Sequence, residues 1–455
     1  MQTIHANELL AGLTLAEPVP VTAVVTDSRK VQPGCVFVCF AGERVDGHDF
    51  AAAAYQNGAA YIVANHPVLG VPENRTVLVQ DSALAMVRMA SNYRMLFSPR
   101  MIGVTGSVGK TTTKEFCYAV LSAFGNTLKT EGNQNNDIGV PNTLFRLTTA
   151  TEYAVVEMGM DHAGEIERLT RCARPAAAII TLIGVSHLEN LGTRENILKA
   201  KMEICAGLPD GAPLVLNADD DLLPTAKVPE RLHAVWFGID APTADVRAQD
   251  ITTVAGGTRF TLTDAEHGSF AVSIPTVGRH TVYDALAAYT AATRLGLDAA
   301  RCAAALSRYQ TTGMRQNIVE KNGITVIEDC YNASPDSMRA ALSVLGELPN
   351  PRKIALLGDM LELGSASEQG HRDAGIWAGE AGVDLLIAYG PHSAAMAEAA
   401  KAKGVTTVHC QTEQEVLQCL RQTVRPGDAL LAKASHAMGL EALLQRFYDD
   451  DDAQK

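Results

Sequence analysis

A glycine-spaced loop that leads into a lysine and three threonines carries the strongest chemical signal in the sequence. The loop follows the apolar run 101–105 and reads Gly-Ser-Val-Gly-Lys-Thr-Thr-Thr from Gly106. Backbone N–H groups freed by its two glycines can surround phosphate oxygens at a helix N-terminus, and Lys110 can reach terminal phosphates. Thr111 or Thr112 can offer a hydroxyl to Mg²⁺. The pattern predicts a nucleotide triphosphate site built from Thr105, Gly106, Ser107, Val108, Gly109, Lys110, Thr111 and Thr112.

The loop departs from the strict phosphate-loop pattern at one place. Val104 stands where the first glycine of G-x-x-x-x-G-K-[ST] belongs. A bare Gly-Lys-Thr is common by chance, but here it lies between an expected strand and an expected helix, which is the context the motif requires. Phosphate binding is therefore favoured over an ordinary strand-turn-helix connection, and the variant spacing indicates a particular class of nucleotide enzyme.

Two further polar residues fall where a magnesium site needs them. Glu157 ends the apolar run 153–157, and His187 follows the next such run. Because the carboxyl ends of parallel strands meet at one sheet edge, we expect both residues beside the phosphate loop. Mg²⁺ prefers oxygen ligands and keeps several waters. Taken alone, Glu157 fits a helix-capping carboxylate equally well and a lone histidine is more often structural, so the metal hypothesis depends on the shared edge.

The segments around these residues alternate between short apolar runs and helical stretches. In the central part we expect strands at 101–105, 153–158, 176–183 and 214–217. This alternation predicts a parallel sheet with helices on both faces. Between 244 and 274 the apolar period shifts to two, which predicts an antiparallel insertion or edge, and an alanine-rich helix follows over 282–295.

The two flanking parts show similar apolar runs. The first part has expected strands at 21–26, 35–40, 60–63 and 76–79 and a helix at 83–96, and the last part has expected strands at 324–327, 353–357, 385–389 and 429–432. The four aspartates 449–452 are expected to form a solvated tail. The sequence predicts an α/β protein of three domains: a small N-terminal α/β domain (1–98), a central P-loop ATPase-like parallel-sheet domain (99–312) and a C-terminal Rossmann-like doubly wound domain (313–455).

Composition excludes several classes of partner. The net charge of −13 argues against nucleic acid and anionic membrane surfaces, which reward a basic face. No apolar run approaches the ~20 residues that span a bilayer, and the chain opens without the basic segment of a secretory signal. We expect a soluble cytoplasmic protein without membrane insertion. The nine cysteines include no C-x-x-C pair, which favours buried thiols over disulfides or a zinc site.

Eight segments taken together identify a family resemblance. They are 105–115 (TGSVGKTTTKE), 132–141 (GNQNNDIGVP), 157–159 (EMG), 164–166 (GEI), 187–189 (HLE), 199–204 (KAKMEI), 329–335 (DCYNASP) and 356–364 (LLGDMLELG). These segments resemble the Mur ligase family, and the resemblance covers essentially the whole chain. The segments YNASP and GDMLELG are its most specific pieces, and they resemble one branch of the family.

The resemblance implies a reaction. In that branch, ATP phosphorylates the terminal carboxylate of UDP-N-acetylmuramoyl-tripeptide, and the amine of D-alanyl-D-alanine then attacks the acyl phosphate. This is the last cytoplasmic step of UDP-muramoyl-pentapeptide synthesis for peptidoglycan. An anionic carboxylate must approach an anionic γ-phosphate, so cations at the meeting point are the main catalytic device and positioning is second. The implied cofactors are ATP and two Mg²⁺ ions, the implied partners are the two substrates, and we expect a monomer.

The resemblance also assigns roles to the phosphate and metal groups. Lys110 and Thr111 would serve the β- and γ-phosphates and the first Mg²⁺, while Glu157 and His187 would hold the second Mg²⁺. Lys201 matches a lysine that the family carries as a carbamate, and this modification would convert a cation into an anion that supports the metal site.

Further residues are implied to bind the nucleotide and the UDP-linked substrate. Arg315, Asp329 and Asn332 would reach the nucleotide from the last domain when the domains close and exclude water. Ser28, Arg29 and His48 resemble the segments that cradle the uridine diphosphate, although a salt bridge explains Arg29 equally well. The remaining implied nucleotide contacts are Asn136, His280 and Asp284.

A few positions depart from the family pattern. The family commonly has asparagine where this chain has Leu182, Thr281, Asp284 and Ser334. An ionised aspartate accepts hydrogen bonds but donates none, so Asp284 lacks the donor that an amide would offer to adenine. None of these changes removes a phosphate or metal group.

Three alternative functions remain to be weighed. One is the family branch that adds a diamino acid, but the segment 329–335 differs from the Asp-Tyr-Ala-His type motif of that branch, and its Asp-Asn-Pro-Arg signature is missing. Another is a P-loop switch or motor whose hydrolysis changes the shape of a partner. An inactive scaffold is disfavoured because every expected catalytic position keeps a usable side chain.

Overall fold

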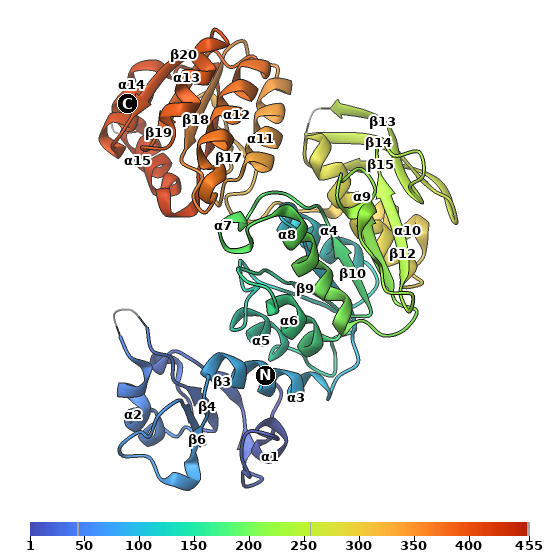
Figure 1. Ribbon diagram of the computed structural model, residues 1–455, viewed down its shortest axis with the longest axis vertical. Coiled ribbons are helices and arrows are strands. Elements are labelled where there is room, and N and C mark those ends of the chain that lie inside the picture. Colours follow the sequence, from blue (N-terminus) through green and yellow to red (C-terminus); the bar gives the residue numbers. More distant parts are fainter. Residues whose placement is uncertain (43–44, 255, 453–455) are drawn as a thin grey trace.

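The computed structural model describes residues 1–42, 45–254 and 256–452. Its main sheets form three units in chain order, with the N-terminal and C-terminal units placed on separate sides of the central one (Figure 1). No helix in the described ranges is both long and apolar enough to cross a membrane. All nine cysteines lie in these ranges, where each is buried and unpaired.

The N-terminal unit is built on a four-stranded parallel sheet. Its strands are β3 (Ala23–Val25), β4 (Cys35–Val38), β5 (Tyr61–Ala64) and β6 (Thr76–Leu78), and its helices are α1 (Ala6–Leu9), α2 (Ala51–Gln56) and α3 (Ser82–Arg94). A short antiparallel pair, β1 (Ile4–His5) and β2 (Pro20–Val21), lies beside it. The expected strands and helix of this part are confirmed, with bounds that differ by one or two residues.

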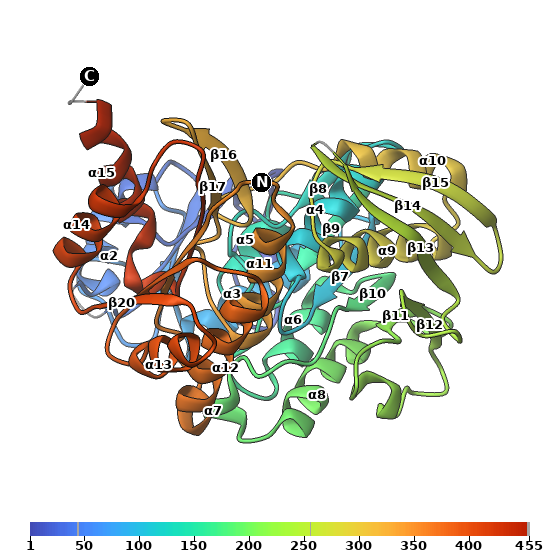
Figure 2. The same cartoon turned by 90° about the horizontal axis from the view of Figure 1, so that it is seen from above.

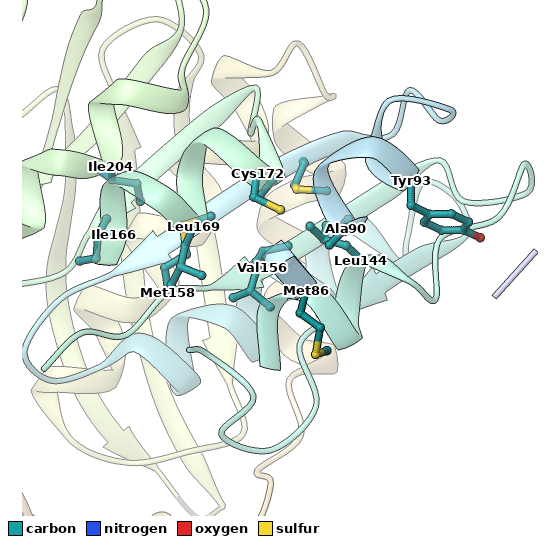
Figure 3. Close-up of a cluster of buried hydrophobic side chains, with 14 of the residues drawn as sticks. Met86, Ala90, Tyr93, Leu144, Val156, Met158, Ile166, Leu169, Cys172 and Ile204 are labelled. Atoms are coloured by element: carbon teal, nitrogen blue, oxygen red, sulfur yellow. The ribbon is translucent and has the colours of Figure 1, made fainter. Parts of the chain in front are cut away.

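Helix α3 joins the N-terminal unit to the central one. Its buried side chains Met86, Ala90 and Tyr93 lie in one hydrophobic core with residues of the central helices and strands (Figure 3). The Tyr93 hydroxyl donates a hydrogen bond to the Leu147 carbonyl at 2.7 Å, and Arg94 Nε donates to the Ala173 carbonyl at 2.8 Å. Burial of apolar surface on α3 therefore stabilises both units at once.

The central unit is a nine-stranded sheet in the order β15-β14-β13-β12-β11-β10-β7-β9-β8. All neighbouring strands from β8 through β9, β7, β10, β11 and β12 to β13 are parallel. The pairs β13–β14 and β14–β15 are antiparallel. The period-two segment thus extends one edge of the sheet, on the side away from the N-terminal unit (Figure 1, Figure 2). Thr253 of this segment donates a hydrogen bond to Glu347 Oε2 of the C-terminal unit at 3.1 Å. The strands are β7 (Arg100–Thr105), β8 (Thr127–Lys129), β9 (Tyr153–Glu157), β10 (Ala177–Ile180), β11 (Pro213–Asn217), β12 (His233–Gly238), β13 (Val246–Val254), β14 (Gly257–Asp264) and β15 (Gly268–Ile274).

Helices cover both faces of the central sheet, as the alternating pattern predicts. One face carries α4 (Lys110–Leu121), α9 (Arg279–Arg294) and α10 (Ala299–Ala305), and the other carries α3, α5 (Gly139–Leu144), α6 (Glu165–Ala173) and α8 (Arg194–Met202). The short helix α7 (Leu188–Leu191) follows β10 at the edge that faces the C-terminal unit.

The C-terminal unit is a six-stranded sheet in the order β16-β17-β21-β18-β19-β20. Only β16 is antiparallel to its neighbour within the described residues. The strands are β16 (Asn317–Lys321), β17 (Ile324–Glu328), β18 (Lys353–Gly358), β19 (Leu385–Tyr389), β20 (Thr406–Cys410) and β21 (Ala429–Lys433). One face carries α11 (Pro335–Glu347), α12 (Ser367–Glu380) and α13 (Ala394–Ala402), and the other carries α14 (Glu413–Thr423) and α15 (Leu440–Asp452).

The structure corrects one expectation and adds five strands. The aspartates 449–452 form the end of helix α15 instead of a tail. Apolar residues at helical spacing, Leu440, Leu443, Leu444 and Phe447, bury one side of this helix and hold it in place. The sequence did not predict β1, β8, β12, β16 or β20. The α/β class with doubly wound sheets is confirmed.

Candidate active site

The phosphate loop connects β7 to α4 at the middle of the central sheet. Gly106 has φ 151° and Gly109 has φ 86°, and both values favour glycine. A Cβ atom at Gly106 would lie only 1.8 Å from Thr181 Oγ1. The loop therefore needs glycine for its close approach to Thr181, which directly follows β10. The Ser107 N–H donates to the Leu182 carbonyl at 2.9 Å, and this bond holds the loop against the same segment.

Lys110 begins α4 and folds back over the loop. Its Nζ donates to the Gly106 carbonyl at 2.8 Å and to the Ser107 carbonyl at 3.2 Å. Burial lowers the pKa of this ammonium, while Glu157 opposes that effect. The charge of Lys110 thus lies where the loop would receive the terminal phosphates of a nucleotide.

Glu157 ends β9 and faces the first turn of α4. Thr111 Oγ1 donates to its Oε2 at 3.0 Å, and Asn135 Nδ2 donates to its Oε1 at 3.0 Å. Lys114 Nζ lies 3.6 Å from Oε2, and the Glu157 side chain is only 1% exposed. The structure therefore brings together the hydroxyl and the carboxylate that the sequence assigns to Mg²⁺, and both supply the oxygen ligands that this ion prefers.

His187 lies at the same sheet edge in the left-handed conformation, with φ 63°. Its Nδ1 is 3.2 Å from Asp161 Oδ1 and 3.8 Å from Glu362 Oε2 of the C-terminal unit. Burial, followed by the positive charges of Lys110 and Lys201, lowers the pKa of this imidazole to about 4. His187 is therefore neutral near pH 7, which is the form that binds a metal.

Lys201 is buried on α8, behind the cavity wall. Its side chain is 1% exposed, and among the described residues no acidic group pairs with it. Burial, and then the charge of Lys110, lowers its pKa well below the usual value. The structure thus holds a buried, uncompensated amine close enough to influence both His187 and Lys110.

The C-terminal unit contributes a second group of side chains. The Arg315 guanidinium lies 3.9 Å from the centre of the Tyr331 ring. Asp329 Oδ2 accepts from Lys433 Nζ at 2.7 Å, and Lys433 also donates to the Asn332 carbonyl at 2.8 Å. Sequence reasoning missed Lys433, although a lysine directly after the apolar run 429–432 is a signal at the same sheet edge.

A glutamine in the linker ties the two units together. Gln316 Oε1 lies 2.5 Å from His280 Nε2, and Gln316 Nε2 donates to the Val277 carbonyl at 2.6 Å. Its backbone N–H donates to Asp329 Oδ1 at 3.2 Å. Gln316 therefore connects the start of α9 to the strand end that carries Asp329, a role that no sequence pattern indicated.

These groups line one cavity of about 500 Å³ between the central and C-terminal units. The expected site residues on its wall are Ser107, Val108, Gly109, Lys110, Thr111, Thr112, Asn136, Glu157, His187, His280, Asp284, Arg315, Asp329 and Asn332. Thr105, Gly106 and Lys201 are not on the wall. Asn136 lines the cavity, but its side chain also caps α5 by accepting from the Gly139 N–H at 2.9 Å. The cavity has room for part of a nucleotide and a substrate end.

The three residues expected to hold a uridine diphosphate lie apart from this cavity, in the N-terminal unit. Ser28 and Arg29 form a 3₁₀ turn (Ser28–Lys30), and Arg29 makes a two-pronged ion pair with Asp27 at 2.9 and 2.8 Å. His48 is buried, and its Nδ1 is 2.6 Å from Asp46 Oδ1. The structure thus supports the salt-bridge interpretation of Arg29, while its side chain stays 88% exposed.

The fold and the cavity define a three-domain phosphate-loop nucleotide enzyme. Three family models match the chain: "Mur ligase family, catalytic domain" over residues 20–94, "Mur ligase middle domain" over 104–292, and "Mur ligase, glutamate ligase domain" over 314–436. The chain belongs to the Mur ligase family, as the resemblance predicted.

Relatives and solved structures agree with this assignment. The chain is 38% identical over 447 residues to the UDP-N-acetylmuramoyl-tripeptide--D-alanyl-D-alanine ligase of Bacillus subtilis, with 96% of each chain covered. It is 38% identical over 396 residues to the Escherichia coli enzyme of the same name, with 86% of each covered. MurF from Acinetobacter baumannii has a TM-score of 0.89 at 30% identity over 99% of each chain. MurF from Thermotoga maritima, solved with ADP, has a TM-score of 0.85 at 29% identity, covering 96% of this chain and 99% of its own.

Proposed function

We propose that this chain is an ATP-dependent ligase that joins D-alanyl-D-alanine to UDP-N-acetylmuramoyl-tripeptide. The observation that carries the proposal is the single cavity in which Lys110, Thr111, Glu157 and His187 face Arg315 and Asp329. Relatives with that activity in their name share 38% identity over as much as 96% of the chain. The reaction supplies the D-alanyl-D-alanine end of the peptidoglycan precursor.

The chemistry consists of two displacements. The terminal carboxylate of the tripeptide attacks the γ-phosphorus of ATP, the bond to ADP breaks, and an acyl phosphate forms. The unprotonated amine of the dipeptide then attacks the acyl carbon, the bond to phosphate breaks, and the nitrogen loses a proton as the amide forms. Both steps gather negative charge, so Lys110 and the N-terminus of α4 stabilise the transition state.

The oxygen donors of Thr111 and Glu157 fit magnesium, and His187 adds one nitrogen donor. Thr111 would hold one Mg²⁺ with the nucleotide phosphates, and Glu157 with neutral His187 would hold a second. When bound, the ions neutralise charge between the γ-phosphate and the substrate carboxylate. The chain's own part is to present Glu157 already oriented by Thr111 and Asn135.

Lys201 carries the carbamate in this proposal. Its lowered pKa increases the share of the neutral amine, and this form attacks the carbon of CO₂ and loses one proton to give an anionic carbamate. The anion would offset the positive charge of Lys110 and support the site of His187.

Each of the three units has its own role in binding the substrates. Arg315, Asp329 and Asn332 contact the nucleotide from the C-terminal unit, and closure excludes water from the acyl phosphate. Ser28, Arg29 and His48 hold the uridine diphosphate. We place one domain boundary at 98/99, in the connection between α3 and β7. We place the other at 312/313, in the connection between α10 and β16. We further propose that the enzyme is a monomer and acts in the cytoplasm.

A phosphate-release assay tests the proposal. The purified chain is incubated with ATP and Mg²⁺, with each substrate present or omitted, and products are followed by mass spectrometry. The expected result is phosphate release that requires both substrates and yields UDP-N-acetylmuramoyl-pentapeptide. Release without either substrate would favour a P-loop switch, and turnover with a diamino acid in place of the dipeptide would favour the other branch of the family.

A further inference from the structure

A second buried carboxyl group touches the phosphate loop from the opposite side to Glu157. Asp284 lies on α9, is 5% exposed, and lines the cavity. Its Oδ1 accepts a hydrogen bond from Thr113 Oγ1 of α4 at 2.8 Å. A Cβ atom placed on Gly109 would lie 2.6 Å from this same oxygen. The carboxyl group is therefore in contact with the backbone that is to surround the phosphates.

No cation offsets Asp284 within the described ranges. The titratable groups that face it are the Cys117 thiol of α4 and the Tyr309 phenol after α10, and burial, together with Asp284 itself, raises the pKa of both. On its own helix, His280 pairs with Gln316, and the Tyr283 hydroxyl donates to Asp219. The nearest lysine of the loop, Lys110, is turned to the carbonyls of residues 106 and 107. A carboxylate anion at this position would be desolvated without compensation.

Such a group keeps its proton. Burial raises the pKa of Asp284 to about 8, against the opposing effect of the Thr113 hydrogen bond. A protonated carboxyl group has one O–H donor as well as acceptor capacity. Oδ1 already accepts from Thr113, and no partner of Oδ2 is recorded among the described residues. The proton can therefore be carried by Oδ2.

We propose that Asp284 serves in the nucleotide site as a neutral carboxylic acid that donates a hydrogen bond to the bound nucleotide. Ionisation removes this donor and places a negative charge beside the phosphate loop, so nucleotide affinity falls as the group loses its proton. The inference rests on the proposed function only in taking an adenosine nucleotide as the ligand.

The pH dependence of ADP binding tests this proposal. The dissociation constant of Mg-ADP is measured by calorimetry from about pH 6.5 to about pH 9.5. For the wild-type chain we expect affinity to weaken above about pH 8 by up to about 10-fold per pH unit. Asp284→Asn keeps a donor at every pH and is expected to remove this slope. Asp210→Asn, which changes a surface carboxylate with a side chain 85% exposed, is the matched control and is expected to keep it.

Infrared difference spectroscopy gives a second readout that does not depend on affinity. The wild-type chain should show a C=O band of a protonated carboxyl group that disappears as the pH rises and that Asp284→Asn lacks at all pH values. A flat wild-type binding profile, an unchanged slope in Asp284→Asn, or the missing band overturns the proposal. ADP binding requires neither the tripeptide nor the dipeptide. A chain that shows the slope but forms no pentapeptide would therefore refute the proposed function alone.

Discussion

The two sides of the phosphate loop hold buried carboxyl groups in opposite electrostatic settings. On the β9 side, Glu157 accepts from Thr111 and Asn135 and has Lys114 at 3.6 Å. On the α9 side, Asp284 accepts from one hydroxyl and has no cation nearby in the described ranges. Donors and a cation stabilise an anion, whereas burial without them favours the neutral acid. One site thus uses one carboxyl group for its charge and another for its proton.

Removing the charge of Glu157 should have the largest effect on the rate of pentapeptide formation. Glu157→Gln keeps the shape and the contact with Thr111 but removes the anion that is to bind Mg²⁺. We expect kcat to fall by about 10³-fold, measured as pentapeptide formed per enzyme at saturating substrates. Glu131→Gln, which changes a half-exposed glutamate in the same unit, is the control. A loss below about 10-fold would show that charge at Glu157 is not required.

Lys201→Ala should cause the second-largest loss of activity, because it removes the amine that supports the His187 end of the site. We expect activity to fall by about 10²-fold and to recover in part when a short carboxylate such as acetate is added. The measurement is the steady-state rate with and without acetate. Normal activity of the variant in bicarbonate-free buffer would contradict the carbamate.

Lys433→Met tests the contribution of the C-terminal unit. This change removes the hydrogen bonds that hold Asp329 Oδ2 and the Asn332 carbonyl. Hydrogen bonds to charged groups contribute roughly 1.5–3 kcal/mol, so we expect kcat/KM for ATP to fall by at least about 10-fold. Lys401→Met on the exposed side of α13 is the control. Equal kinetics in both variants would show that Lys433 does not position Asp329.

The last expected effect is on the stability of the fold and comes from the Asp284 side. The pKa of Asp284 is about 8 in the folded chain, whereas the ordinary value of an aspartate is 3.8. The unfolded chain therefore loses this proton at lower pH than the folded chain. The contribution of protonated Asp284 to the free energy of unfolding is therefore fully present below about pH 3.8. This contribution is lost as the pH rises towards about 8. Asp284→Asn should therefore raise the unfolding temperature more at pH 8 than at pH 4, measured by thermal melts. A shift that does not grow with pH would contradict the neutral acid.

The sequence predicted the parts of the site that depend on local pattern. The phosphate loop, Glu157 and His187 lie at the ends of apolar runs, and the ends of parallel strands meet at one edge of a sheet. The sequence alone therefore predicted that these residues lie close together. The protonation of Asp284 was not visible, because it depends on which residues of distant elements surround α9. Gln316 and Lys433 were missed for the same reason: their partners lie 36 and 104 residues away, respectively.

Fold prediction failed at two edge strands of the C-terminal sheet where the local pattern was weak. The strand β20 is mostly exposed at the sheet edge, and polar residues make up most of β16. Neither strand therefore shows an apolar run. The aspartates 449–452 were expected to be a tail because their own composition opposes burial. The preceding apolar residues of α15 continue the helix through them. Local composition thus failed where neighbouring residues determine the conformation.

Isotope transfer in a single turnover tests the ligase account most directly. The terminal carboxylate of UDP-N-acetylmuramoyl-tripeptide is labelled with ¹⁸O, and the enzyme is mixed with ATP and D-alanyl-D-alanine in ordinary water. An acyl-phosphate intermediate predicts that each released phosphate carries one oxygen from that carboxylate, with the amide formed in equal amount. Phosphate free of label would show that ATP is cleaved by water, and this result would contradict the account.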